Sequence, residues 1–187
     1  MTAGGISTRR LEAFSDAVLA VAITLMVLRI GTPTPAPGES MGHAFVNVTL
    51  PAIIYFLITF AVIVIFWTHH HDIFRQLPET TPKRAFIFNM AFLAVVCLLP
   101  FGLEFFTSDT HSYVTVAVYA GLMALASLTL GLLAREVTGA LPASVVLSVV
   151  VFLLAIPFAG LLGGWCLLIW WIDEPIRRIL RRRGVAT

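Results

Sequence analysis

The sequence predicts an all-α integral membrane protein with six transmembrane helices per subunit. Of its 187 residues, 59% are hydrophobic and only 12% are charged, and the mean hydropathy is +0.95. A soluble domain carries roughly 25% charged residues. The apolar residues also fall in long runs of about 20, which is the length that one helix needs to cross the hydrocarbon core of a bilayer.

The first predicted span covers about residues 10–30 and follows a short N-terminal tail, residues 1–8. A cleavable signal peptide is not expected, because Asp16 lies near the start and the apolar stretch is longer than about 15 residues. The span should end before Gly31, because the prolines at 33, 35 and 37 remove backbone donors and favour an extended loop.

Three further spans are predicted at about 45–70, 85–106 and 113–134, separated by polar segments. The last apolar block, 141–172, is too long for one upright helix. Pro157 and the glycines at 160, 163 and 164 favour a turn near its middle, so we expect two short spans, near 143–158 and 162–180, rather than one long tilted helix. Residues 9–181 would then form a single six-helix transmembrane domain, and residues 182–187 a C-terminal tail.

The cations support this count. With six spans, Arg29 alone of the 12 lysines and arginines lies on one side, which leaves 11 on the other. By the positive-inside rule, both termini are then cytoplasmic. Five spans would place the C-terminal arginines outside. Those arginines suit anionic headgroups at the membrane surface, and nucleic-acid binding is not expected.

No enzyme or metal site is predicted. The spans contain no glycine-rich phosphate loop, nucleophile elbow or second carboxylate. Adjacent histidines, as in His69-His70-His71, point about 100° apart on a helix, whereas a metal site there favours side chains four residues apart. We therefore expect no cofactor.

The first span has two different faces. With Val21 at zero on a helical wheel, Phe14, Ala17, Leu25 and Leu28 fall within about 40° and Thr24 within about 60°. Ser15 and Asp16 fall beyond about 120° on the other side. The apolar face taken by itself is also what ordinary helix packing would produce.

Several polar residues of three spans are predicted to share one membrane depth. Asp16 and Ser15 lie near one end of the first span, His69 and His70 near the same end of the second, and Asn89 early in the third. Because buried polar groups need partners, we expect a polar network between the helices, with the indole of Trp67 as a further donor. The alternative is that the histidines reach out to water at the helix end.

The pattern Arg10-x-x-x-Phe14-Ser15-Asp16, followed by Ala-x-x-Ala-x-Ala-Ile-Thr-Leu, resembles the signature of prokaryotic members of the transmembrane protein 175 family of potassium channels. The similarity extends, with decreasing strength, over most of the chain. It includes Trp67, His69 and His70, then Asn89, and then the run Leu98-Leu99-Pro100-Phe101.

This resemblance implies a homotetramer in the inner (plasma) membrane of a prokaryote, with the first span of each subunit around a central pore for K⁺ and other monovalent cations. Carried over by position, the apolar gate would comprise Val21, Leu25 and Leu28, and Thr24 would contribute to selectivity. Bacterial relatives usually have a larger residue where this chain has Val21. The inter-helix polar network would comprise Arg10, Phe14, Ser15, Asp16, Trp67, His69, His70 and Asn89.

The function expected from these residues is passive, potassium-preferring cation conduction through a hydrophobic gate. The alternative is a proton-coupled or ion-coupled secondary transporter that uses Asp16, His69 and His70. Transporter sites lie near the bilayer midplane, whereas this polar group is predicted near one membrane surface, so we favour the channel.

Overall fold

The computed structural model describes residues 6–172, which are helical apart from short connections and one isolated bridge between Ser7 and Thr80. The elements in chain order are α1 (Thr8–Val27), α2 (Met41–Ala44), the π-helix η1 (Phe45–Thr49), α3 (Leu50–Phe74), α4 (Lys83–Ser108), α5 (Tyr113–Thr138), α6 (Ala143–Leu153), α7 (Ala155–Leu162) and the 3-10 helix η2 (Gly163–Ile172).

The start of α1 is held by the loop between α3 and α4. The backbone N–H of Thr8 donates to the carbonyl oxygen of Glu79 at 2.9 Å, and that of Thr81 donates to Ile6 at 3.0 Å. The hydroxyls of Thr8 and Thr81 also lie 2.9 Å apart. The bond from Thr8 satisfies a backbone donor that the first turn of α1 leaves free, and the three contacts together fix α1 beside the adjoining ends of α3 and α4.

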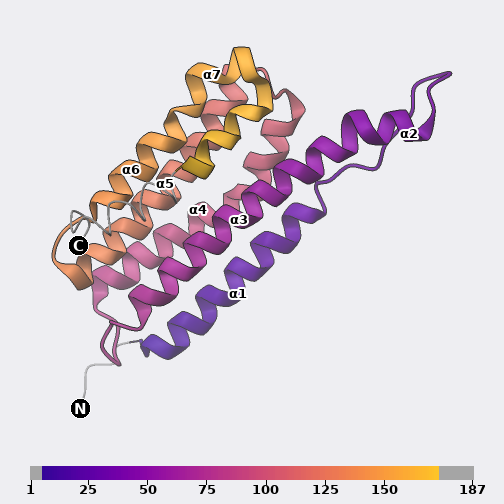
Figure 1. The fold of residues 1–187 in the computed structure, drawn as a ribbon. Helices are drawn as coiled ribbons and strands as arrows, with labels where there is room; N and C mark the ends of the chain where they lie inside the picture. Colours follow the sequence, from indigo (N-terminus) through magenta and orange to yellow (C-terminus); the bar gives the residue numbers. More distant parts are fainter. Residues whose placement is uncertain (1–5, 173–187) are drawn as a thin grey trace.

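Helices α2, η1 and α3 form one continuous apolar rod from Met41 to Phe74. The π-helix precedes Pro51, which has no N–H and whose ring crowds the preceding turn of an α-helix. A wider turn accommodates that ring without ending the helix. Figure 1 shows that the α2 end of this rod extends beyond the other helices.

The core is built around α4 and α5, which pack together along their length. Helix α1 packs on α3 and α4, and α6 and α7 pack on α5. Phe92, Leu99, Tyr119 and Met123 are fully buried at the centre. Helix α5 ends at Gly139, whose φ of 78° is the left-handed conformation that glycine adopts most easily at a helix C-terminus.

The prediction of six transmembrane helices is wrong. Within residues 6–172, four helical segments are long and apolar enough to cross a membrane: Met41–Phe74, Lys83–Ser108, Tyr113–Thr138 and Ala143–Leu168. Helix α1 is not among them, because Arg9, Arg10, Glu12 and Asp16 all fall within its 20 residues.

The last apolar block accounts for the rest of the difference. The chain does turn at Gly163, where φ is 53°, and α7 packs against η2 across that turn. However, α6 with 11 residues and α7 with eight both lie before that turn, within the first predicted span. Only the ten residues of the 3-10 helix η2 follow it in the described part of the chain, which gives about 20 Å against a hydrocarbon core of about 30 Å. The block therefore contains one candidate span, Ala143–Leu168, instead of two.

The argument that both termini are cytoplasmic fails with the six-span count on which it was based. The predicted end of the sixth span, the C-terminal arginines and the tail at 182–187 lie outside the described residues.

Helix α6 approaches α5 closely at Gly131, and this contact allows a test of the packing. A Cβ atom at Gly131 would lie 2.5 Å from Cγ1 of Val145, whereas a Cβ at Gly121 in the same helix would meet nothing within 4 Å. Val145 is buried and β-branched, so it cannot easily move aside. We expect Gly131→Ala to destabilise the protein by about 1–3 kcal/mol. Gly121→Ala should be neutral or stabilising by up to about 1 kcal/mol, because alanine favours helix. Thermal unfolding in detergent would measure both, and equal effects would contradict the packing described here.

Candidate functional site

One face of α1 is buried in the chain and the opposite face is exposed. The buried residues are Thr8, Leu11, Ser15, Leu19, Ala22 and Met26. On the other face the exposed fractions are 52% for Phe14, 56% for Val21, 45% for Leu25 and 77% for Leu28, and Thr24 is also exposed. A shallow apolar hollow of about 250 Å³ lies beside this face, lined by Ala17, Val18, Val21, Ala22, Leu25 and Cys97. We call the residues Phe14, Val21, Thr24, Leu25 and Leu28 the exposed stripe of α1.

A buried chain of hydrogen bonds holds the other face. Ser15, His70 and Asn89, from α1, α3 and α4, each have no exposed surface. The amide of Asn89 donates through Nδ2 to Oγ of Ser15 at 2.9 Å, and its Oδ1 lies 2.8 Å from Nε2 of His70. The Ser15 hydroxyl donates in turn to the carbonyl oxygen of Leu11 at 2.8 Å. Asn89 therefore joins three helices through one side chain.

The geometry defines how the proton is placed on His70. Because Oδ1 of Asn89 can only accept, Nε2 of His70 is the donor. The ring is stacked between Phe74 and Phe92, with centroid distances of 4.3 and 5.7 Å. Its Nδ1 is buried without a hydrogen-bond partner among the described residues.

A second, more exposed layer joins α1 to α3 alone. The indole Nε1 of Trp67 donates to Oδ1 of Asp16 at 2.9 Å. One turn nearer the start of α1, Oε1 of Glu12 lies 3.1 Å from Nδ1 of His71. The rings of Trp67 and His71 are stacked at 6.0 Å. Asp16 thus bonds to an indole, and it is Glu12 that meets a histidine.

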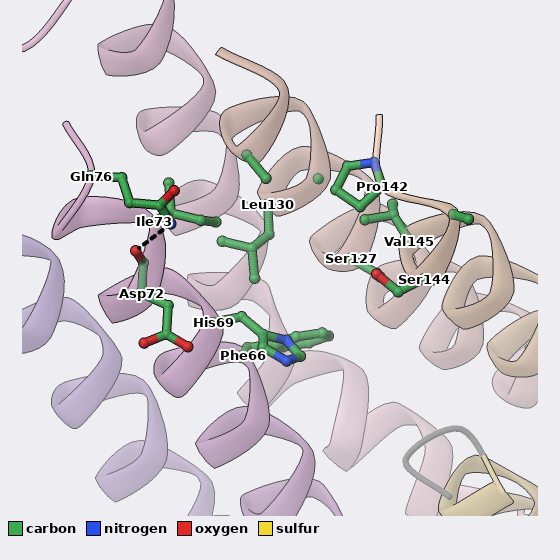
Figure 2. A pocket seen from close by; sticks show the side chains of 13 residues that line it. Phe66, His69, Asp72, Ile73, Gln76, Ser127, Leu130, Pro142, Ser144 and Val145 are labelled. Carbon is green, nitrogen blue, oxygen red and sulfur yellow. Dashed lines mark hydrogen bonds between the residues drawn. The ribbon is translucent and has the colours of Figure 1, made fainter. Parts of the chain in front are cut away.

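The remaining residues of the predicted network lie apart from these two layers. His69 lines a cavity of about 320 Å³ between α3, α5 and α6, on the side of α3 away from α1, as Figure 2 shows. Asp72, Gln76, Ser127 and Ser144 share that cavity. Arg10 is exposed and has no ion pair within residues 6–172. Phe14 belongs to the exposed stripe.

Sequence reasoning missed Glu12, His71 and the ion pair between Arg29 and Glu104, whose atoms lie 3.0 Å apart. Glu12 lies four residues before Asp16 and so falls on the same helical face, which is the pattern that could have indicated it. No comparable pattern joins Arg29 to Glu104, because the pair depends on how α1 and α4 pack.

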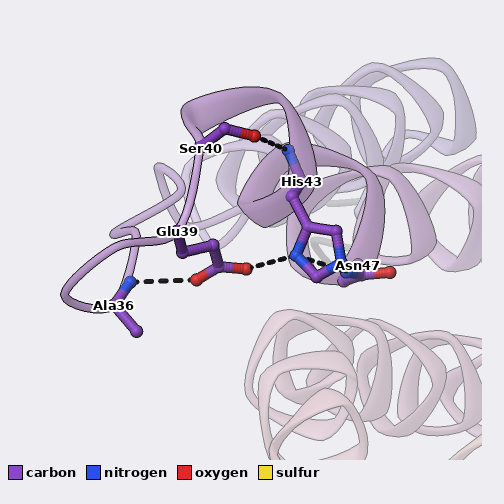
Figure 3. Close-up of polar contacts among 5 residues, drawn as sticks. All are labelled: Ala36, Glu39, Ser40, His43 and Asn47. Carbon is purple, nitrogen blue, oxygen red and sulfur yellow. Dashed lines mark hydrogen bonds and ion pairs between the residues drawn. The ribbon is translucent and has the colours of Figure 1, made fainter.

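The loop before α2 contains a separate polar cluster, drawn in Figure 3. Glu39 accepts a hydrogen bond from the backbone N–H of Ala36 at 2.9 Å, and its other oxygen lies 2.6 Å from Nδ1 of His43. The bond with His43, and then the bond from Ala36, lower the pKa of the Glu39 carboxyl below its usual value of 4.5. Asn47 contacts the same ring.

No group of three or more His, Cys, Asp or Glu side chains in the part of the chain that the structure describes is placed to hold a metal ion. The site is therefore a set of helix-joining hydrogen bonds behind an exposed apolar stripe.

The chain is similar to several known proteins. The family model described as "Endosomal/lysosomal potassium channel TMEM175" matches residues 10–100. A potassium channel of Chamaesiphon minutus is 38% identical over 119 residues, which are 62% of this chain and 58% of that protein. One of Streptomyces collinus is 34% identical, over 61% of this chain and 56% of that protein. The endosomal/lysosomal proton channel TMEM175 of Gallus gallus is 26% identical over 54% of this chain and 20% of its own.

The fold matches as well. The crystal structure of a lysosomal potassium-selective channel TMEM175 homolog from Chamaesiphon minutus superposes with a TM-score of 0.75 at 26% identity, covering 93% of this chain and 97% of that one. The fold and the matches define a multi-pass helical membrane protein. The chain is similar in sequence and fold to bacterial proteins of the TMEM175 family. It spans a little more than half of the length of the curated bacterial relatives that it matches, 58% and 56%.

The role of Asn89 can be tested by Asn89→Leu. This change leaves the buried Oγ of Ser15 and Nε2 of His70 without their partner, and we expect a loss of about 2–3 kcal/mol in unfolding free energy. Asn47→Leu is the control, because Asn47 lies in η1 with an exposed side chain, and this change should cost less than about 0.5 kcal/mol of unfolding free energy. Thermal or denaturant unfolding in detergent would measure both. Equal stability of the Asn89 variant and the native chain would contradict the hydrogen-bond chain.

The hydrogen bonds of Glu39 in the loop before α2 predict that acid destabilises residues 36–44. A carboxyl whose pKa is lowered in the folded state stabilises the fold above its unfolded pKa and loses that contribution as the pH falls through the lower value. Amide exchange of residues 36–44, corrected for the intrinsic rate, should therefore lose protection as the pH falls below 4.5. Glu39→Gln should reduce protection already at pH about 7 and flatten this dependence. If protection falls with pH equally in Glu39→Gln and in the native chain, another group is responsible. Asp109→Asn, in the loop between α4 and α5, is the control and should leave the protection of residues 36–44 unchanged.

Proposed function

We propose that the protein is a passive, potassium-preferring cation channel, a homotetramer whose central pore is lined by the exposed stripe of α1. The observation that carries the proposal is this stripe: Val21, Leu25 and Leu28 are 45–77% exposed although the opposite face of the same helix is fully engaged within the chain. The potassium channels among its bacterial relatives support the same function.

In the proposed tetramer, four copies of the stripe face one axis. Rings of valine and leucine can close such a pore by excluding water, without the side chains touching, so a small widening admits hydrated ions. Thr24 adds four hydroxyls next to the Val21 ring. Its Oγ1 donates to the carbonyl oxygen of Val21 at 2.8 Å, and the lone pairs of that hydroxyl remain available to a partly dehydrated cation.

The polar layers behind α1 would set the width of the pore. The buried chain through Asn89 fixes the rotation of α1, and the bond between Trp67 and Asp16 adds a contact to α3 one turn away. A change in either would move all four copies of the stripe by the same amount in a symmetric tetramer. The cell membrane of a prokaryote is the proposed location, which the bacterial relatives support.

Secondary transport is not proposed. That function would need Asp16, His69 and His70 to act on one substrate or proton path. Each instead has different surroundings: Asp16 bonds to Trp67, His70 bonds to Asn89, and His69 lines the cavity on the other side of α3.

The gate can be tested by ion flux from liposomes containing the full chain. Val21→Asn makes the proposed constriction polar, and we expect basal K⁺ flux to rise by about tenfold, which corresponds to lowering the barrier by about 1.4 kcal/mol. Val146→Asn is the matched control, because Val146 on α6 is 54% exposed against 56% for Val21 but lies away from α1. The control should leave the flux unchanged.

Two outcomes would overturn the proposal that the protein is a channel. One is flux that saturates like a carrier or requires a proton gradient, which matters because the vertebrate relatives are named proton channels. The other is an unchanged flux in Val21→Asn. Light scattering of the protein in detergent tests the tetramer separately, and a monomer would exclude a central pore between subunits.

A further inference from the structure

A pocket lined partly by charged residues lies at the adjoining ends of α4 and α5, away from the proposed pore. It has a volume of about 420 Å³, and no residue of α1 lines it. Its polar wall consists of Arg84 at the second position of α4 and Arg135 and Glu136 in the last turns of α5, with Gly139 beyond. Its apolar wall consists of Ile87, Phe88 and Leu132.

The two arginines have donors to spare. Both are exposed, and neither has an ion pair or side-chain hydrogen bond within residues 6–172. They come from antiparallel helices and face the same space, so the pocket holds two positive charges and the single negative charge of Glu136. A guanidinium presents five N–H donors in a planar fork that matches the oxygens of a phosphate group.

The surroundings indicate an amphipathic ligand. The candidate spans Lys83–Ser108 and Tyr113–Thr138 begin and end at this pocket, which places it at the depth of the lipid headgroups. From Ile87 the exposed face of the two helices continues as apolar surface: Ile87 is 51% exposed, Phe101 55%, Leu125 45% and Leu128 37%. An acyl chain could lie along this face while a phosphate meets the two arginines.

We propose that this pocket binds the phosphate group of an anionic phospholipid, such as phosphatidylglycerol, between Arg84 and Arg135. The net positive charge of the polar wall favours an anionic lipid over a zwitterionic one, whose ammonium would cancel the attraction. Glu136 limits the affinity, because its carboxylate shares the pocket with the bound phosphate.

The test compares the retention of phosphatidylglycerol and phosphatidylcholine by the full chain in detergent, measured by native mass spectrometry or with spin-labelled lipids. Arg84→Gln and Arg135→Gln should each lower the preference for phosphatidylglycerol by about fivefold, and the double variant should lower it further. Glu136→Gln should raise it, which is a change that misfolding would not produce. Arg75→Gln is the matched control, because Arg75 lies in the nearby α3–α4 loop and does not line the pocket. Monodisperse elution confirms that each variant is folded.

Three outcomes would overturn the proposal. If Arg75→Gln lowers the preference as much as the pocket variants do, the attraction is a general effect of surface charge. If Glu136→Gln leaves the preference unchanged, the phosphate does not bind beside that carboxylate. If inorganic phosphate binds and the protein does not distinguish the two lipids, the pocket is a site for free phosphate. Because the test measures lipid retention and not ion flux, its failure would leave the channel proposal unaffected.

Discussion

The structure depends on the buried hydrogen-bond chain from Ser15 through Asn89 to His70. Successive residues of a helix point about 100° apart, so a rotation of α1 by one residue would remove Ser15 from Asn89 and leave polar atoms of three helices unpaired in an apolar core. Apolar packing alone would resist that rotation less, since both faces of α1 contain leucine and other apolar residues. The polar chain therefore selects which apolar face is buried and which remains exposed.

Helix α1 is held at several levels along its length. Its first residue is bonded to the α3–α4 loop, Ser15 and Asp16 are bonded to α4 and α3, and Arg29 just beyond its end meets Glu104 of α4. The surface ion pair contributes little by itself, because both side chains are about half exposed (52% and 51%). The buried chain is the strong contact, and the others prevent the two ends from fraying. A helix supported in this way keeps an exposed apolar stripe in a constant orientation.

The sequence was sufficient to predict the membrane class, the approximate ends of the first four apolar helices, and the two faces of α1, because helical periodicity and proline positions determine them. Comparing how far each residue lies from its helix end also predicted that Ser15, Asn89 and His70 share one membrane depth, and the structure brings them together. It could not show on which side of α3 each histidine lies, because neighbours such as His69 and His70 point about 100° apart and only packing decides which of them meets α4. The span count failed because hydropathy measures apolar length, whereas the last apolar block turns at Gly163 and only the ten residues of η2 follow that turn in the described part of the chain.

The polar head of α1 also explains why this helix is not one of the four candidate spans. Its charged residues are confined to Arg9, Arg10, Glu12 and Asp16, and the two acidic ones have partners on α3. A helix with such a head is stabilised in a membrane by protein contacts more than by lipid. The same contacts that allow α1 to stay in an apolar environment turn its two acidic residues toward α3 and away from the exposed stripe. One set of hydrogen bonds thus satisfies the polar head and leaves the opposite face smooth and apolar, which is the property that a hydrophobic gate requires.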